Sequence, residues 1–377
     1  MRGAFLRTFR TPRTEEKRPF EWDHFSDQPK VILDKRYKYC MRLKNWPDLI
    51  KVAASASAIL PISLVFMIME EIKRTISNGK IQASDPERFF GMGVNLEKGT
   101  EQFEMIAELG IKEVLVRLPL WDLGNIQNYV KFVETWRDQG CKVMLNVLQD
   151  VGTIGNRVAI REQAQIVFGA FGEIVGKAQI GNAINRSKWG FYGVNEYLDF
   201  FEIFKSERDL TAPNIELCGP SVIDFEYHVA LRALFNLRKI QYDQVSALLY
   251  VDRCGHPDKK QYGLFNLRRK IELFSAMSRM SPKVKTPKIL ITEVNWPLLG
   301  REPYAPTSVK ECVTTECYAK YMADYHEIAY KTGMVETVYW HQLIAPGYGL
   351  IDNRKNSLPN KELFNRYRTM IASYKGH

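Results

Sequence analysis

The sequence has few cysteines, and their spacing matches no familiar metal-binding or redox motif. Its six cysteines are scattered over 377 residues, with no CxxC pair and no histidine spacing typical of a zinc site. Cys141 and Cys218 fall beside or within expected strands, where a buried thiol behaves as a small apolar side chain. Cys312 and Cys317 are close enough in sequence to pair, and the sequence leaves their redox state open.

A glycine-rich phosphate loop is also lacking. Gly91-Met92-Gly93 is too short and lies within an expected strand, whereas a dinucleotide site needs its glycines between the first strand and the next helix. No basic stripe of regular spacing follows residue 85, which argues against nucleic-acid binding. No secretory signal is evident, because the first long apolar run comes late and lacks a clear cleavage site. We therefore expect no metal, no organic cofactor and no nucleic-acid partner.

The net charge of +10 is concentrated in an N-terminal extension, residues 1–85. Residues 1–80 hold 16 Lys and Arg against 9 Asp and Glu, so the rest of the chain is close to balance. Within the extension, residues 52–69 are 18 consecutive uncharged residues between Lys51 and Glu70, near the minimum length of a membrane-spanning helix. The apolar side chains of this run favour insertion, while three serines and Pro61 oppose it.

Two interpretations of residues 52–69 remain open. A spanning helix would leave the N-terminus in the cytoplasm and the large domain outside, because the basic flank precedes the apolar run. The alternative is a buried or interfacial helix packed on the main domain of a cytoplasmic protein. The basic arm would favour an anionic membrane surface. Localisation and oligomeric state are not determined by the sequence.

From residue 86 to 377 strand-like and helix-like segments alternate, which is typical of βα units around a parallel sheet. We expect strands at 90–96, 113–118, 142–148, 178–181, 215–218, 245–251, 288–296 and 337–341. We expect helices at 100–109, 126–139, 162–175, 194–206, 227–237, 267–280, 315–331 and 361–374. Eight such units predict an α/β protein with a (β/α)8 TIM barrel, preceded by a mainly helical or irregular extension. The main alternative is an open doubly wound sheet, which would want the missing phosphate loop.

Polar side chains follow most of the expected strands. The clearest case is the apolar run 288–292, which ends in Glu293, Asn295 and Trp296. Because the C-terminal ends of all barrel strands face one cavity, we expect these side chains to meet there. Carboxylates, amides and indole rings together suit a sugar, whose hydroxyls need donors and acceptors while its C–H face stacks on aromatic rings. The expected lining is Asn95, Arg117, Asp122, Asp150, Asn182, Asn185, Arg186, Asp224, Glu226, Tyr250, Asp252, Glu293, Asn295, Trp296, Trp340 and His341.

In their order along the barrel, these residues resemble the strand-end motifs of the clan A glycoside hydrolases, over about residues 88–375. The resemblance implies a retaining glycosidase with Glu293 as nucleophile, positioned by Arg117 and Tyr250. It also implies that Asn182 binds the sugar's 2-hydroxyl and that Trp340 stacks beneath the ring. The other residues assigned to an oligosaccharide or polysaccharide substrate are Asn95, Asp150, Asn185, Glu226, Asp252, Trp296 and His341.

One position departs from that family. The general-acid glutamate should follow the asparagine, but the run is Asn182-Ala183-Ile184-Asn185. Retention needs two carboxyl groups about 5–5.5 Å apart, and alanine cannot donate a proton. Glu196, which follows Asn195, superficially resembles the motif, but we interpret it as a solvated residue of the next helix.

Three explanations of the alanine remain. Another cavity group supplies the proton, the substrate carries a good leaving group, or hydrolysis is lost and glycan binding is kept. The candidate donors are Asp150, Glu226, Asp252 and His341; loop capping by Asp150 and a buried, hydroxyl-binding role for His341 are alternatives. The leading hypothesis is a glycoside hydrolase-like protein. Its rival is a noncatalytic glycan-binding protein in polysaccharide or surface-glycan assembly. An isomerase or aldolase barrel is a third interpretation, but a clear buried lysine or phosphate loop is lacking.

Overall fold

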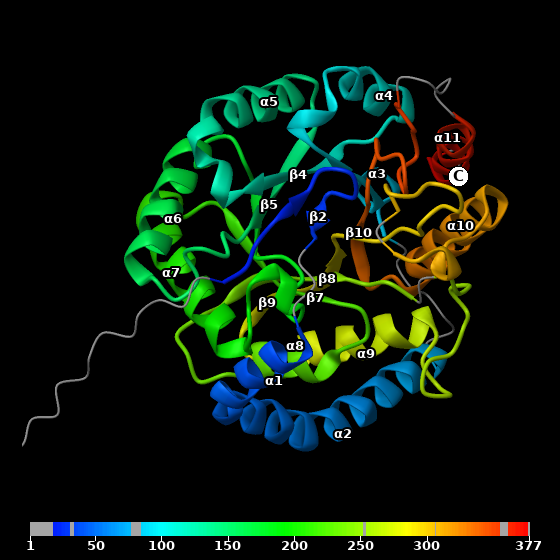
Figure 1. Ribbon diagram of the computed structural model, residues 1–377. Coiled ribbons are helices and arrows are strands. Elements are labelled where there is room, and N and C mark those ends of the chain that lie inside the picture. Colours follow the sequence, from blue (N-terminus) through cyan, green and yellow to red (C-terminus); the bar gives the residue numbers. More distant parts are fainter. Residues whose placement is uncertain are drawn as a thin grey trace, which may run out of the picture.

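Eight parallel strands form a closed barrel in the computed structural model, which describes residues 18–30, 34–76, 84–251, 254–305, 307–354 and 361–375 (Figure 1). The strand order is β10-β3-β4-β5-β6-β7-β8-β9, so neighbours in sequence are neighbours in the barrel. The predicted TIM barrel is therefore confirmed. The strands are β3 (Phe90–Val94), β4 (Glu113–Pro119), β5 (Lys142–Leu148), β6 (Lys177–Ile180), β7 (Glu216–Ile223), β8 (Tyr242–Leu248), β9 (Val284–Ile291) and β10 (Val335–Trp340).

Helices surround this barrel and follow the expected order. They are α3 (Pro86–Phe89), α4 (Glu101–Leu109), α5 (Ile126–Asp138), α6 (Arg157–Phe171), α7 (Val194–Thr211), α8 (Tyr227–Leu234), α9 (Leu267–Met280), α10 (Thr315–Thr332) and α11 (Glu362–Lys375). Helix α4 ends at Leu109, as the sequence predicted, and Gly110 caps it with φ +67°. Helix α6 starts five residues before its expected beginning, because the Asn156 side chain caps the amides of Val158 and Ala159.

Most strands differ from their expected bounds, and two of the differences bear on the site. Strand β7 continues through Pro220 to Ile223, beyond its expected end at residue 218. The pairing with β8 shifts register between Pro220 and Val222, so the missing N–H is accommodated. Strand β9 begins at Val284 and ends at Ile291, so Glu293 lies just beyond the strand instead of within it. This places Glu293 at the barrel mouth.

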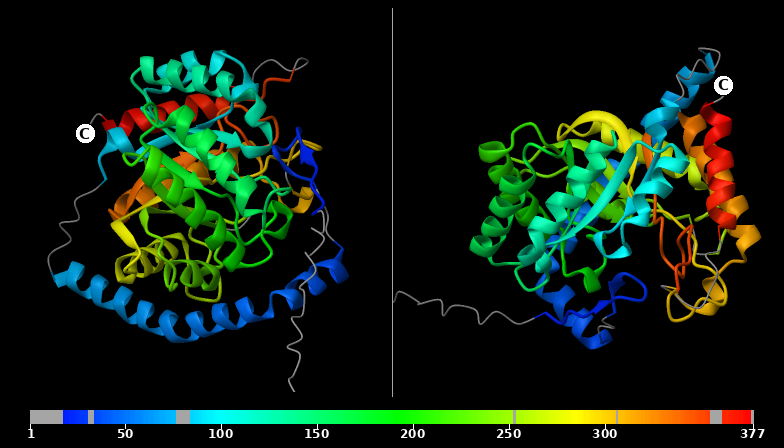
Figure 2. Two further views of the ribbon diagram at one scale, coloured as in Figure 1. Left: turned by 90° about the vertical axis from the view of Figure 1, so that its left-hand side faces the viewer. Right: turned by 90° about the horizontal axis from the view of Figure 1, so that it is seen from above.

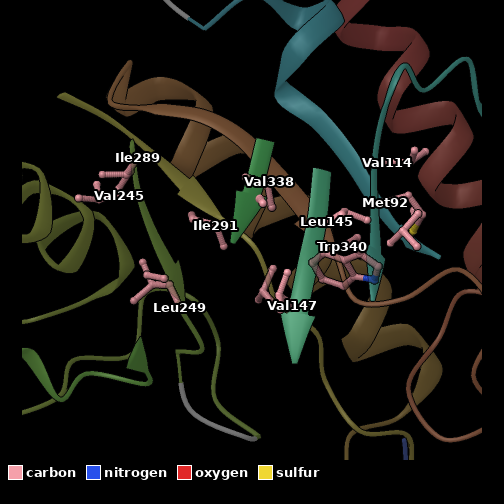
Figure 3. Close-up of a cluster of buried hydrophobic side chains, with 14 of the residues drawn as sticks. Met92, Val114, Leu145, Val147, Val245, Leu249, Ile289, Ile291, Val338 and Trp340 are labelled. Carbon is pink, nitrogen blue, oxygen red and sulfur yellow. The ribbon is translucent and has the colours of Figure 1, made fainter. Parts of the chain in front are cut away.

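The main hydrophobic core lies between the barrel and its helices. Outward-facing strand residues such as Val147, Val245 and Val338 are fully buried there (Figure 3). Trp340 belongs to this cluster, and its Nε1–H donates to Tyr318 Oη of α10 at 2.7 Å.

The barrel interior is layered from charged to apolar to polar. At the N-terminal ends, Lys177 Nζ donates to Gln244 at 2.6 Å and to Glu336 at 2.8 Å. Above them lies a buried apolar layer of Leu115, Met144, Cys218, Leu290 and Tyr339. Toward the C-terminal ends the buried side chains become polar again, with Arg117, Asn146, Gln179 and Asn182. The polar layer leads into the mouth.

The N-terminal extension contacts the barrel in two places. Strands β1 (Trp22–Asp23) and β2 (Gln28–Pro29) form a small antiparallel hairpin that lies over the barrel mouth (Figure 1). Helices α1 (Lys35–Lys44) and α2 (Trp46–Ile76) follow, and α2 packs along α8 and α9 on the outside of the barrel. The helical extension is thus present, while the domain boundary expected at residues 85–86 stays a prediction.

Candidate functional site

A cavity of about 130 Å³ opens at the C-terminal ends of the strands. It is smaller than the roughly 300–1,000 Å³ of pockets that bury drug-sized ligands, so it matches a small ring or a chain end. Its lining combines carboxylates, cations, amides and aromatic rings, from the hairpin and from strand-end loops. The described residues that line it are Ser26, Asp27, Gln28, Arg117, Arg186, Lys188, Trp189, Ile223, Asp224, Tyr250, Glu293, Asn295, Pro297, Thr307, His341 and Tyr348.

Glu293 and Tyr250 form the central pair of this cavity. The Tyr250 hydroxyl donates to Glu293 Oε1 at 2.7 Å. Burial and the neighbouring Glu293 carboxylate raise the pKa of Tyr250 well above its usual value, so the phenol keeps its proton. A protonated phenol can donate to a carboxylate, which fixes the direction of one carboxylate oxygen and leaves the other available. This arrangement suits a carboxylate that acts on a ligand in the cavity.

Arg117 faces the hairpin from strand β4. Its Nη1 donates to the carbonyl of Asp27 at 3.0 Å, and its guanidinium lies 5.3 Å from the ring centre of Trp22 and 5.8 Å from that of Trp189. Its buried Nε has no hydrogen-bond partner among the described residues. The structure therefore shows no direct hydrogen bond by which Arg117 would position Glu293. The buried Nε–H of Arg117 is left as a donor for a ligand.

Asp27 brings a second carboxylate into the cavity from the tip of the hairpin. It is 3% exposed and lies 2.8 Å from Lys98 Nζ. Gln342 Nε2 donates to Asp27 Oδ2 at 2.8 Å, and the Tyr348 hydroxyl lies 3.3 Å from the same oxygen. Asn95 Nδ2 donates to Gln342 Oε1, which joins Asn95 to this network below the hairpin. A buried ion pair with several further hydrogen bonds holds the hairpin tip in place.

His341 and Asn295 also line the cavity. The imidazole of His341 stacks on Tyr348 with 5.4 Å between ring centres and 15° between planes. Burial lowers the pKa of His341 to about 4, despite the opposing influence of Glu293. Asn295 Nδ2 donates to the His341 carbonyl, which joins the loops after β9 and β10. A neutral imidazole can bind hydroxyl groups, but its remaining N–H is too weak an acid to protonate a leaving group at neutral pH.

The position of Ala183 is enclosed by apolar side chains. Ala183 is fully buried and packs in one cluster with Leu148, Trp189 and Leu248. The other carboxylates of the described cavity lining are Asp27 and Asp224, and both are paired with cations, Asp27 with Lys98 and Asp224 with Arg186. A carboxylate that accepts hydrogen bonds from a cation is a poor proton donor.

Several expected site residues lie near the cavity without lining it. Asn182 is fully buried; its Oδ1 accepts from Asn146 and Gln179 at 3.2 Å, and its Nδ2 has no partner among the described residues. Asn185 Nδ2 donates to Glu226 Oε2 at 2.8 Å. Glu226 pairs with Arg186, which lines the cavity together with Asp224, so Asn185 and Glu226 lie at the cavity rim.

Others lie away from the cavity. Asp150 accepts from Gly152 N at 2.9 Å and from Gln163 Nε2 at 3.2 Å, so it caps its loop. Asp122 accepts from the Tyr129 hydroxyl at 3.1 Å. Glu196 is half-buried and pairs with Arg18 at 2.7 Å, which differs from the solvated helix residue expected. Asp252 lies outside the described residues.

The two expected tryptophans point away from the barrel axis. Trp296 Nε1–H donates to the Gly255 carbonyl at 3.1 Å, and Trp340 lies 6.1 Å from Trp296 in a stacked pair. The reason is the period-two alternation of a strand: Tyr339 and His341 face the interior, so Trp340 faces the helices. Neither expected tryptophan therefore lines the cavity, whose described aromatic lining residues are Trp189, Tyr250, His341 and Tyr348.

Sequence reasoning missed the contribution of the hairpin. Asp27, Ser26 and Gln28 lie about 90 residues before the strand-two arginine that they cover, and their polar, turn-like sequence carries no barrel periodicity. Trp189 ends the short 3-10 helix Ser187–Trp189 beyond β6, and Tyr348 lies beyond β10. The only signal available was their aromatic character close to strand ends.

A larger pocket of about 390 Å³ lies between the α1–α2 junction and the rim of the barrel. Lys38, Asp48 and Leu49 form one wall, and Asn185, Tyr192 and Glu226 form the other. Across the described part of the chain, no group of three or more His, Cys, Asp or Glu is placed to hold a metal ion.

Comparisons with known proteins show structural similarity to several solved structures. No protein-family model matches the sequence, and no curated protein matches it. A β-glucosidase from Thermotoga maritima in complex with glucoimidazole is similar over 77% of this chain and 99% of its own, with TM-score 0.56 and 9% identity. A GH39 enzyme from Xanthomonas axonopodis pv. citri is similar over 78% and 68%, with TM-score 0.55 and 13% identity.

A third likeness is to the virulence factor SghA of Agrobacterium tumefaciens. Its complex with the substrate analogue salicin covers 76% of this chain and 96% of its own, with TM-score 0.55 and 10% identity. At such low identity these likenesses concern the fold alone. The chain shares the (β/α)8 barrel architecture of clan A glycoside hydrolases.

Proposed function

We propose that the barrel acts on a glycan, with Glu293 as the carboxylate that contacts the anomeric carbon. The observation that carries the proposal is the Tyr250–Glu293 hydrogen bond of 2.7 Å at the centre of a small, mixed polar and aromatic cavity. The fold likeness to glycoside hydrolases supports it by analogy.

In this proposal, the free oxygen of Glu293 attacks the anomeric carbon as the bond to the leaving oxygen breaks. Water then attacks the anomeric carbon of the glycosyl ester that forms and loses a proton to solvent, which releases the sugar and restores the carboxylate. Tyr250 orients the nucleophile. The unpartnered Nε of Arg117 and the neutral imidazole of His341 offer hydrogen bonds to sugar hydroxyls.

Because this proposal includes no general acid, we expect the substrate range to be restricted by the leaving group. Ala183 is sealed among apolar side chains, and the paired carboxylates of Asp27 and Asp224 are poor donors. General acid catalysis contributes about 10²–10⁴-fold, so substrates with basic leaving groups should react slowly. Substrates whose leaving group departs as a stable anion should be affected least.

The test compares dinitrophenyl and methyl glycosides of several sugars. We expect turnover of the dinitrophenyl glycosides by the wild type and its loss in Glu293→Ala, whereas azide should restore turnover in that variant by taking the nucleophile's place. Asp150→Asn, a loop carboxylate outside the cavity, is the matched control and should retain wild-type rates. Equal rates for wild type and Glu293→Ala would remove Glu293 from the mechanism.

A noncatalytic glycan-binding function is the second candidate. Ala183 favours it, because the barrel retains polar cavity groups while the position of the family's acid holds no ionisable side chain. Calorimetry with oligosaccharides, run beside the hydrolysis assay, separates the two functions. Binding weakened by Asn295→Ala, with no turnover of any dinitrophenyl glycoside, would establish binding alone.

A further inference from the structure

Helix α2 exposes an apolar face along most of its length. Nine large apolar side chains on it are between 46% and 77% exposed, at helical spacings of three and four: Trp46, Leu49, Ile50, Ile62, Val65, Ile68, Met69, Ile72 and Ile76. Between Ile50 and Ile62 the exposed positions carry mainly alanine, serine and proline. The helix is long and apolar enough to cross a membrane, and 17% of its most apolar window is buried.

The acidic side chains of α2 all turn toward the barrel. Asp48 lies 3.6 Å from Arg232 of α8, and Glu70 lies 2.9 Å from Arg279 of α9. Glu71 pairs with Arg269 of α9. Their carboxylates are thus turned away from the exposed face.

The exposed charges beside the apolar face are basic. Lys51 and Lys73 are exposed on α2 itself, and Lys35, Arg36 and Lys38 are exposed on the preceding helix α1. Two exposed aromatic side chains, Tyr39 at 64% and Trp46 at 58%, lie near the junction of α1 and α2. An apolar stripe flanked by basic and aromatic side chains is the pattern of a helix that lies within the surface of an anionic bilayer.

We propose that α2 seats the protein in the plane of an anionic membrane while it stays packed on α8 and α9. The opposite face of α2 supports this geometry, because Ser63 and Met67 are buried against the barrel and the three ion pairs fix the helix at both ends. Crossing the bilayer would separate all three pairs and expose the apolar surface that α2 covers. A helix that lies in the plane of the membrane keeps the ion pairs of its inner face and buries the apolar side chains of its outer face.

This orientation sets the direction of the barrel mouth. Helix α2 runs along the outside of the barrel, from the side of the hairpin toward the opposite end (Figures 1 and 2). Its N-terminal end, with Asp48 and Leu49, forms one wall of the 390 Å³ pocket beside the rim residues Asn185 and Glu226. The mouth would therefore open along the membrane surface, where ligands borne on the membrane can reach it.

Vesicle flotation of the full chain tests the proposal. We expect the wild type to float with phosphatidylcholine vesicles that contain phosphatidylglycerol, and more weakly without the anionic lipid. The double variant Val65→Glu/Ile68→Glu should lose binding by about tenfold or more, since it places two charges in the apolar stripe. Leu210→Glu/Leu237→Glu, two exposed leucines of the barrel, is the matched control and should float like the wild type. Circular dichroism checks that each variant is folded.

Absence of flotation by the folded wild type, or equal flotation of both double variants, would overturn the proposal. Self-association of the wild type without vesicle binding would assign the apolar face to a second copy of the chain instead.

Labelling of single cysteines from one side of the membrane distinguishes a helix that lies in the membrane plane from a helix that spans the membrane. Lys51→Cys and Lys73→Cys are made singly after Cys40, Cys254, Cys312 and Cys317 are replaced by serine, which leaves only the buried Cys141 and Cys218. In sealed membrane vesicles of one orientation, an impermeant maleimide should label both positions from the same side. Labelling of one position only, with the other requiring detergent, would show a spanning helix and overturn the proposal. Neither assay depends on the barrel acting on glycans.

Discussion

Tyr250 and Glu293 show how two loops beyond neighbouring strands make one functional pair. Tyr250 follows β8 and Glu293 follows β9, and the parallel pairing of these strands brings the two side chains within 2.7 Å. A hydrogen bond to a charged group contributes about 1.5–3 kcal/mol. The orientation of the carboxylate should therefore depend on the phenol.

Tyr250→Phe is expected to lower turnover of dinitrophenyl glycosides by about 10–100-fold, because Glu293 loses its donor while the ring still packs. The reduction should fall on kcat, since the hydroxyl contacts Glu293, the proposed nucleophile. Steady-state kinetics measures this, with Tyr262→Phe as control because Tyr262 is 83% exposed. An unchanged kcat would show that Tyr250 does not orient Glu293.

Aromatic contacts help to hold the hairpin of β1 and β2 over the mouth, together with the ion pair between Asp27 and Lys98. The Trp22 ring centre lies 5.1 Å from that of Trp121 and 6.0 Å from that of Trp189, and Arg117 stacks on its face. Each such contact contributes about 0.5–1.5 kcal/mol. The hairpin should therefore open locally more easily than the barrel unfolds.

Trp22→Ala should release the hairpin without unfolding the barrel. Because the indole's ring packing stabilises the hairpin by about 2–3 kcal/mol, amide exchange at residues 22–29 should accelerate about 30–100-fold, while strands β4 and β5 keep wild-type protection. Hydrogen exchange with mass spectrometry measures both regions. Tyr262→Ala, a truncation of an exposed aromatic residue, controls for the removal of a ring; unchanged exchange in Trp22→Ala would contradict this role of Trp22.

The charged layer at the barrel floor stabilises the closed sheet. Burial alone would raise the pKa of Glu336, but hydrogen bonding and attraction from Lys177, with help from Arg88, lower it below its ordinary value. The stability from this group is therefore present at neutral pH and is lost as the pH falls through the lowered pKa. Lys177 lies on β6 and Glu336 on β10, so the pair crosses the barrel interior.

Glu336→Gln should lower the free energy of unfolding by about 2–4 kcal/mol at neutral pH, because Lys177 loses its closest buried counter-charge. Urea unfolding followed by circular dichroism measures the loss. Glu327→Gln, which removes an exposed i,i+4 partner of Lys331, should change stability by less than about 0.5 kcal/mol. A similar small effect at Glu336 would show that the layer does not stabilise the barrel.

The free energy of unfolding of the whole molecule should depend on pH through two buried histidines. Burial lowers the pKa of His326 to about 4, and likewise that of His341 to about 4. His326 Nδ1–H donates to the Met322 carbonyl at 2.8 Å, and Nε2 lies 3.3 Å from the Tyr367 hydroxyl, which fits the neutral ring. The unfolded chain binds protons near pH 6.5 and the folded chain does not, so stability falls as the pH drops from 6.5 toward 4.

Each of these histidines should contribute roughly 2–2.5 kcal/mol to the fall between pH 7.5 and 4.5. Urea unfolding at pH 7.5 and 4.5 measures it, and His326→Gln should show a loss smaller by roughly 2 kcal/mol than the wild type. His228→Gln, at an exposed position, should show the wild-type loss. An identical loss in His326→Gln and the wild type would contradict the buried, neutral assignment.

The sequence by itself determined the barrel and the position of its central carboxylate. Alternating strand and helix periodicity depends on local burial and capping, and signals such as Gly110 and the run before Glu293 are carried by adjacent residues. Parallel topology then required that strand-end residues share one edge. For this reason Arg117, Tyr250, Glu293 and His341 could be assigned to one cavity from the order of the strands alone.

Only the tertiary structure decided which side chains enter the cavity and what closes it. Adjacent residues of a strand point to opposite faces, so Trp340 faces the helices while Tyr339 faces the barrel interior. The sequence does not determine the alignment of a strand to within one residue. The seating of Asp27 against Lys98 and the packing of α2 on α9 join segments that are distant in sequence. Such contacts depend on shape and charge complementarity between surfaces that exist only once the chain has folded.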